Sequence, residues 1–271
     1  MASINTNMSA TLAVSNLNKT TDEMTSVLTA MSSGKSINSA SDDAAGLAVY
    51  TAMSVDYAAW EQAGDNAEVA TAILETADGG LSEIGDILER MYELASQAAS
   101  GSVTDTERAY LDDEYQELIL QIDSIVDSTT YFDTSLLDGT YDESFTVSAD
   151  SSVAAIDVTL ATAFDAASLG LAGDLTSSTN STTELTAIEA AVTDVSSGRA
   201  TVGALMSRFD YAAGNIETAQ TNLESAMSVY MDADIAQLSA DQTELGVKMD
   251  SAIQALSVSN ENLEKLSRLL S

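Results

Sequence analysis

Apolar residues recur at alternating steps of three and four over most of the chain, a spacing typical of helices that pack along a narrow seam. The longest uninterrupted run has ten apolar members: Ala67, Ala70, Leu74, Ala77, Leu81, Ile84, Leu88, Met91, Ala95 and Ala98. Gly79 and Gly80 fall inside this run, and each lowers helix propensity by about 1 kcal/mol relative to alanine. Because the apolar phase continues across both glycines, the pattern predicts one continuous helix.

Both ends of the chain show the same spacing. In the N-terminal segment the predicted seam residues are Val14, Leu17, Met24, Leu28 and Met31, with Thr21 as a polar member. In the C-terminal segment they are Ile235, Leu238, Leu245, Met249, Leu256, Leu263, Leu266 and Leu270. We predict that these two seams pair as a coiled coil and serve for self-assembly.

The middle of the chain carries other signals. Thr104 and Glu107 have the spacing of a capping box at a helix start. Between 143 and 160, apolar and polar residues alternate on both sides of an Asp-Ser-Ser turn, which predicts one β-hairpin. Residues 174–183 are small and polar, as in a linker. The predicted fold is mainly α: an elongated antiparallel helical rod with terminal coiled-coil helices and one small β-hairpin.

Charge is distributed very unevenly along the chain. Residues 1–41 have a net charge of zero and residues 235–271 have −2, whereas the whole chain has −34, so residues 42–234 carry −32. Unpaired charge is costly to bury. Ends with so little charge therefore indicate burial against a partner, and we expect that partner to be another copy of this chain.

Composition excludes several classes of site and partner. The chain has no cysteine, histidine or proline, which removes thiol chemistry, the commonest general base and the usual helix breaker. The net charge of −34 argues against nucleic acid and anionic membrane as partners. It also favours a saline environment, because salt screens self-repulsion. A long apolar segment and a secretory signal peptide are not expected.

Three groups of neighbouring carboxylates are candidates for metal binding or catalysis: Asp42 with Asp43, Asp112 with Asp113, and Asp232 with Asp234. None has the spacing of an EF-hand loop, and Asp42 and Asp43 are better placed to start a helix, where the macrodipole favours negative charge. We therefore predict no catalytic residue, no metal and no cofactor. An enzyme that uses carboxylates stays a weaker alternative.

The sequence resembles bacterial flagellins over most of its length. The similarity lies in MASINTNMSATLAVSNL, MSSGKSINSASDDAAGLAV, ILERMYELASQAASG, YFDTSLLDG, ALMSRFDYAAGNIETAQTNLESA and the terminal NENLEKLSRLLS. Two departures stand out: the returning helix ends SAMSVYMDAD without an arginine, and TYFDTS replaces a more usual Gln-Phe-Asn-Gly turn. Residues 174–183 fall where larger flagellins insert outer domains, so the chain resembles a short flagellin.

This resemblance implies an organisation and a function. Residues 1–41 and 232–271 would form a discontinuous filament-core coiled-coil domain, and 42–231 a rod domain. The chain would be a structural subunit that polymerises into the extracellular flagellar filament. It would leave the cell unfolded, with an export chaperone, the export apparatus, the filament cap and hook-junction proteins as partners. A hook–filament junction protein is the alternative, because junction proteins share the terminal pattern.

The resemblance also implies a surface recognised by the flagellin-sensing toll-like receptor. Arg90, Leu94, Gln97 and Glu114 match the family's epitope pattern. The alternative interpretation is that these residues make lattice contacts between neighbouring subunits.

Overall fold

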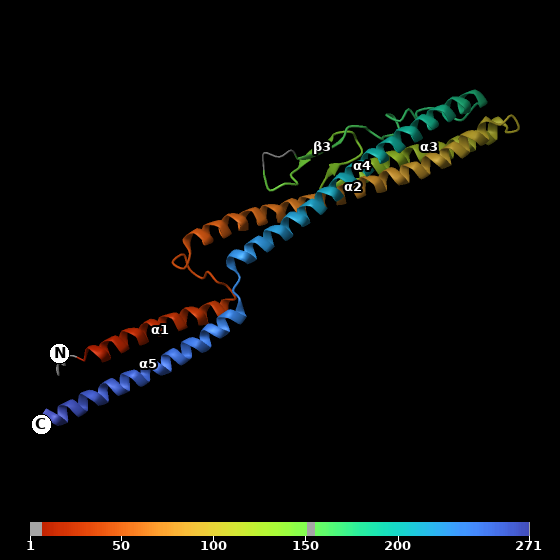
Figure 1. The fold of residues 1–271 in the computed structure, drawn as a ribbon. Coiled ribbons are helices and arrows are strands. Elements are labelled where there is room, and N and C mark those ends of the chain that lie inside the picture. Colours follow the sequence, from red (N-terminus) through yellow and green to blue (C-terminus); the bar gives the residue numbers. More distant parts are fainter. Residues whose placement is uncertain (1–6, 151–154, 271) are drawn as a thin grey trace. The chain divides into compact units, whose positions relative to one another are not determined.

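The computed structural model describes residues 7–150 and 155–270, and most of them are helical (Figure 1). Its helices are α1 (Met8–Ser33), α2 (Ala44–Ala99), α3 (Asp105–Ser128), α4 (Ser178–Met231) and α5 (Ile235–Leu270). Its strands are β1 (Thr130–Tyr131), β2 (Thr134–Ser135), β3 (Tyr141–Phe145) and β4 (Ile156–Leu160), which pair antiparallel as β1–β2 and β3–β4. The prediction of a mainly α chain with a small β-hairpin is confirmed.

The chain divides into two compact units. A terminal unit comprises Met1–Val55 and Asn222–Ser271, and a central unit comprises Asp56–Thr221. The predicted boundaries at 41 and 232 lie close to the gaps between α1 and α2 and between α4 and α5. The compact units instead divide within α2 and α4, so each of these helices contributes residues to both units.

The core of the central unit is built along α2. All ten members of its predicted apolar run are buried. They pack with buried residues of α3, α4 and the β3–β4 hairpin in a single cluster. Within this unit α2 and α4 run antiparallel, since Gly64 lies against Ile216 and Asp78 bonds to Arg199.

The two glycines in α2 have different surroundings, although the helix is continuous across both, as predicted. A Cβ atom added at Gly79 would meet nothing within 4 Å. At Gly80 it would lie 2.7 Å from Thr129 Oγ1 and 2.9 Å from Leu137 Cδ1. Gly80 therefore lets the segment that follows α3 pack directly against the helix.

Polar side chains fix where helices start. Thr104 and Glu107 form the predicted capping box at the start of α3. The hydrogen bond from the Thr104 backbone lowers the pKa of the Glu107 carboxyl. At the start of α2, Asp43 Oδ1 accepts hydrogen bonds from Ala45 N (3.0 Å) and Gly46 N (2.9 Å). The prediction that Asp42 and Asp43 start a helix is therefore confirmed for Asp43 but not for Asp42, which binds backbone amides that precede the helix.

The predicted β-hairpin is present as β3 and β4. Its register pairs Tyr141 with Leu160 and Phe145 with Ile156. Phe145 also packs edge-to-face on Phe209 of α4, with ring centroids 5.9 Å apart, which attaches the hairpin to the helical core. Part of the predicted Asp-Ser-Ser turn lies outside the described residues.

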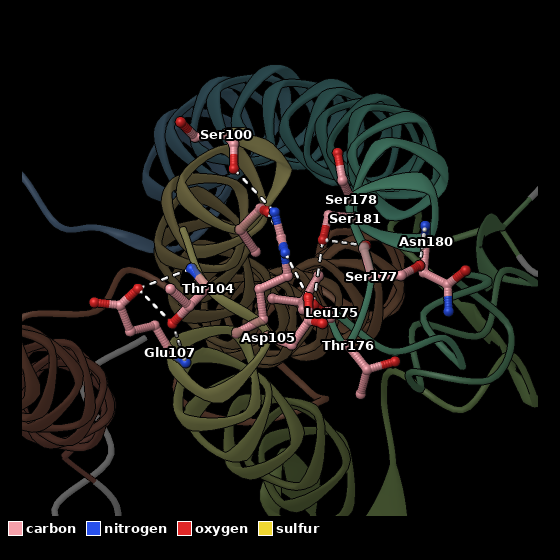
Figure 2. Close-up of polar contacts among 12 residues, drawn as sticks. Ser100, Thr104, Asp105, Glu107, Leu175, Thr176, Ser177, Ser178, Asn180 and Ser181 are labelled. Carbon is pink, nitrogen blue, oxygen red and sulfur yellow. Dashed lines mark hydrogen bonds and ion pairs between the residues drawn. The ribbon is translucent and has the colours of Figure 1, made fainter. Parts of the chain in front are cut away.

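The prediction of a linker over 174–183 is wrong for its second half, because α4 begins at Ser178. Figure 2 shows why this polar segment is ordered. Ser181 is fully buried, and its hydroxyl donates to the carbonyl of Ser177 (2.9 Å) and to that of Leu175 (3.4 Å). Ser177 Oγ in turn accepts the Asn180 amide at 3.1 Å. Small hydroxyl side chains that satisfy local backbone groups are typical of helix starts.

The end of the central unit at which α3 and α4 begin is closed by buried polar contacts. The Arg108 guanidinium donates to the carbonyls of Ala98 (2.8 Å) and Ser100 (3.0 Å) and so caps the last turn of α2. Nearby, Tyr115 Oη donates to Glu184 Oε2 at 2.7 Å, and burial raises the pKa of this phenol. A Cβ at residue 173 would collide with the Glu184 side chain, so a larger residue there would have to displace the carboxylate that binds Tyr115.

The two glycines of α2 give a matched pair of substitutions. We expect Gly79→Ala to raise the free energy of unfolding by about 1 kcal/mol, because alanine favours the helix and the added methyl meets nothing. Gly80→Ala gains the same propensity but must displace Thr129, whose hydroxyl bonds to Ile125 O at 2.7 Å. Denaturant unfolding of the two variants should therefore differ by at least about 1 kcal/mol. Equal stabilities would contradict the close packing at Gly80.

Candidate self-assembly surface

The terminal unit contains an antiparallel pair of helices, α1 and α5 (Figure 1). At one end Asn7 Nδ2 donates to the carbonyl of Ser259 at 3.2 Å. At the other end Lys35 and Asp232 form an isolated antiparallel bridge, and Ala233 N donates to Gly34 O at 3.0 Å. These contacts fix the register, so residues 7–35 run alongside residues 232–259.

The inward face of α1 differs from the predicted seam at alternate positions, where the residue that faces α5 is one position earlier in the sequence. Leu17, Met24 and Met31 are half-buried, as expected for seam members. Val14 and Leu28 lie beside this line and are 40% and 45% exposed. The intervening inward positions are taken by Ala13, Thr20 and Val27. Val14 and Leu28 thus flank the helix pair instead of lying inside it.

The inward face of α5 follows the spacing read from the sequence more closely. Leu245 is buried, and Leu238, Met249, Leu256 and Leu263 are half-buried. Ile235 keeps the same phase but is exposed, as the first residue of the helix. For two further predicted members, Leu266 and Leu270, the structure describes no side chain.

This helix pair has a thin core. Of the described side chains in α1 and α5, only Ala30 and Leu245 are buried. Large apolar side chains remain exposed on both helices: Met8, Leu12, Val14, Leu28, Ile235, Val247, Ile253 and Val258. Apolar side chains left exposed on a helix pair gain free energy when a partner covers them. With its low charge, this surface is the strongest candidate for contact with other copies.

The carboxylate groups singled out in the sequence bind backbone or side-chain donors. Asp42 Oδ2 accepts from Asn38 N and Ser39 N, and these backbone bonds, mainly that from Ser39, lower its pKa. Asp234 Oδ1 caps the start of α5, and Asp112 Oδ1 accepts from Leu175 N at 2.8 Å. Among the described residues no three acidic side chains gather as a metal site would require. The bonds of Asp42, Asp112 and Asp234 hold loop and helix-start backbone in place.

The four predicted receptor-contact residues do not share one surface. Arg90 donates to Glu114 (2.7 Å) and Glu93 (2.9 Å), and these bonds raise its pKa, with Glu114 as the larger cause. Arg90, Glu114 and Gln97 are exposed. Leu94 is 1% exposed and lies in the core, because its position on α2 points toward the interior. Leu94 therefore cannot be part of an exposed epitope in this fold.

Known proteins resemble the chain along nearly its whole length. Residues 4–142 match the bacterial flagellin N-terminal helical region, and residues 185–270 match the bacterial flagellin C-terminal helical region. The chain belongs to the bacterial flagellin family. It is 34% identical to a flagellin of Listeria innocua, over 98% of this chain and 99% of that protein. It is 31% identical to a flagellin of Halalkalibacterium halodurans, with the same coverage of both chains.

A solved structure supports the same assignment. The crystal structure of Bacillus cereus flagellin matches with a TM-score of 0.52 and 31% identity, over 60% of this chain and 94% of that one. Flagellins are structural proteins, and this flagellin is a subunit that polymerises into the bacterial flagellar filament. Similarity over the full length favours the filament subunit over the junction protein. None of the described helices is both long and apolar enough to span a bilayer.

The antiparallel register can be tested with cysteines, because this flagellin has none of its own. Ser259 Oγ lies 3.1 Å from Asn7 Oδ1, whereas Val258 is exposed. In filaments we expect Asn7→Cys with Ser259→Cys to form an intrachain disulfide on mild oxidation, seen as a mobility shift on a non-reducing gel. Asn7→Cys with Val258→Cys is the matched control. Equal oxidation of both pairs in filaments would contradict the register.

Proposed function

We propose that the α1–α5 pair is the surface through which this flagellin assembles, and that its two helices become fully stable only when neighbouring copies cover them. One observation carries the proposal. Among its described side chains the pair has few that are buried, yet it exposes large apolar residues on both helices. The charge distribution supports it, since the terminal segments are nearly neutral within a chain of −34.

The energetics of helix packing favour terminal helices that gain most of their stability on assembly. Most of the stability of a protein helix comes from packing of its apolar face, and α1 and α5 bury only Ala30 and Leu245 among their described side chains. Each large apolar side chain that becomes fully buried contributes about 1.5–3 kcal/mol. Several such residues per subunit make the polymer strong while the single chain keeps loose ends. A contact between different surfaces of successive copies does not close, which gives an open helical polymer.

Loose terminal helices also suit passage out of the cell. We infer that the chain is exported unfolded, without a cleaved signal peptide, through the flagellar export apparatus. In this proposal a chaperone covers the apolar face of α5 until export, and the filament cap and hook-junction proteins receive the subunit outside. The support is physical: helices with so little buried surface unfold at low cost.

Acidity indicates the medium in which the filament works. Packing many copies of a −34 chain brings like charges together, and salt weakens this repulsion, since the Debye length falls from ~10 Å at 0.1 M to ~3 Å at 1 M. We therefore propose that the filament is adapted to saline surroundings.

The assembly surface is tested by a pair of neighbouring substitutions on α5. Leu256 is half-buried against α1, and Ser257 is exposed. We expect Leu256→Asp to abolish polymerisation, because a carboxylate would be enclosed without a partner, and Ser257→Asp to retain filaments at high salt. Electron microscopy counts filaments, and circular dichroism checks that the central unit stays folded. Normal filaments from Leu256→Asp would refute the proposal.

Wild-type filaments equally long in salt-free and in 1 M salt buffer would refute the saline interpretation.

Receptor recognition is proposed for the exposed part of the matched residues alone. Arg90, Gln97 and Glu114 are accessible, and the Arg90–Glu114 bond presents both groups together. We expect Arg90→Ala to lower activation of the flagellin-sensing toll-like receptor by about tenfold, equivalent to about 1.4 kcal/mol. Arg199→Ala, which removes another exposed arginine bonded to an acid, is the matched control. Equal activation by the two variants in a reporter-cell assay would refute this surface.

A further inference from the structure

Within the described part of the central unit, one cation has no ion pair or hydrogen bond to its own chain. The four basic residues between 56 and 221 are all arginine. Arg90 bonds to Glu114, Arg108 to Asp105 and Arg199 to Asp78. Arg208 is exposed on α4 and forms no ion pair or hydrogen bond with any residue the structure describes. In a unit so rich in acid, an arginine left unpaired stands apart.

The part of α4 around Arg208 has two electrostatically different faces. Between residues 197 and 222 its only acids are Asp210 and Glu217, and both line a groove between α2 and α4. Arg208 and Tyr211 are not among the groove residues, and at about 100° per residue they lie roughly half a turn around the helix from it. Tyr211 is 80% exposed. One face therefore has carboxylates, and the opposite face has a cation and an aromatic ring.

The groove itself has an apolar floor and an acidic rim. It encloses about 740 Å³, and its floor includes Phe209, Ile216 and Ala67. Across the groove from Asp210 and Glu217, helix α2 contributes three acids to the rim: Glu61, Asp65 and Glu68. An aromatic ring fits the floor, and a guanidinium fits the rim, because arginine binds carboxylates with directed, charge-assisted hydrogen bonds.

We propose that Arg208 and Tyr211 of one subunit dock into this acid-rimmed groove of a neighbouring subunit in the filament. The occupant is a second copy because the two surfaces are complementary in charge and lie on opposite sides of the same helix. A contact between two different surfaces repeats without closing, as a filament requires. It also compensates charge, since each contact places a cation among the five carboxylates that line the groove. This inference rests on filament formation and adds a lateral contact outside the terminal helices.

The charge component is tested with two arginines of the same helix. Arg208→Gln and Arg199→Gln remove the same group and the same charge, but Arg199 is bonded within its own chain. We expect Arg208→Gln to raise the critical concentration for polymerisation by about tenfold and Arg199→Gln to change it less than twofold. Sedimentation of filaments measures both values, and circular dichroism confirms folding. Equal critical concentrations for the two variants would overturn the proposal.

A cross-linking experiment tests the geometry independently. Asn215 is exposed one helical turn from Tyr211, and Thr71 lines the groove. Chains with Asn215→Cys are mixed with chains carrying Thr71→Cys, polymerised, and treated with a short bis-maleimide. We expect a heterodimer on a denaturing gel, and none when Tyr110→Cys, an exposed position on α3, replaces Thr71→Cys.

The outcomes separate this contact from filament formation itself. Filaments that form but give no 215–71 heterodimer would overturn the docking proposal and leave assembly through α1 and α5 intact. Wild-type chains that form no filaments would instead count against assembly, whatever the cross-links in other samples show.

Discussion

The main physical constraint on this flagellin is the electrostatic repulsion that its own negative charge causes between copies. A chain of −34 packs against copies of itself most favourably where carboxylates are absent or where a cation meets them. The structure uses both means. The terminal segments carry almost no net charge. The acids of α4 near Arg208 lie only on the groove side of the helix. Several of the remaining acids accept hydrogen bonds from backbone amides, either at helix starts or in loops.

Within the central unit, stability and the capacity to pack laterally come from the same elements. α2 buries one continuous apolar face against α3, α4 and the hairpin, and this leaves its other side free to form the rim of the groove. The terminal unit is the reverse case, with little buried and much apolar surface exposed. We interpret the central unit as the part that holds its fold alone and the terminal unit as the part that gains its fold from neighbours.

Local spacing determined which features could be predicted. Three features depend on residues a few positions apart and could therefore be predicted from the sequence. They are the ten buried positions of α2, the capping box at Thr104 and the β3–β4 hairpin. The inward face of α1 could not be predicted, because pairs of adjacent residues have nearly equal polarity. These pairs are Ala13 and Val14, Thr20 and Thr21, and Val27 and Leu28. Only pairing with α5 decides between them.

Other features depend on tertiary contacts that spacing cannot reveal. Residues 178–183 read as a linker, yet the burial of Ser181 and the hydroxyl bonds of its neighbours make them helical. Leu94 matched a surface motif, although its place on α2 turns it inward. The cap that Arg108 places on α2 and the Tyr115–Glu184 pair could not be predicted, since the first binds backbone carbonyls and the second joins residues 69 positions apart.

The kind of cation used in each unit has a consequence for behaviour in alkali. All four basic residues of the central unit are arginines, and hydrogen bonds to acids raise the pKa of Arg90 and of Arg199. Those of the terminal unit are Lys19, Lys35, Lys248 and Lys265, with Arg268 as the exception. Lysine loses its proton near pH 10.4, and the bond to Glu244 moves the pKa of Lys248 upward. Its ion pair is therefore intact below that range and is lost above it. Strongly alkaline media thus break the Lys248–Glu244 ion pair and leave α5 more negative, while the Arg90–Glu114 and Arg199–Asp78 pairs of the central unit persist.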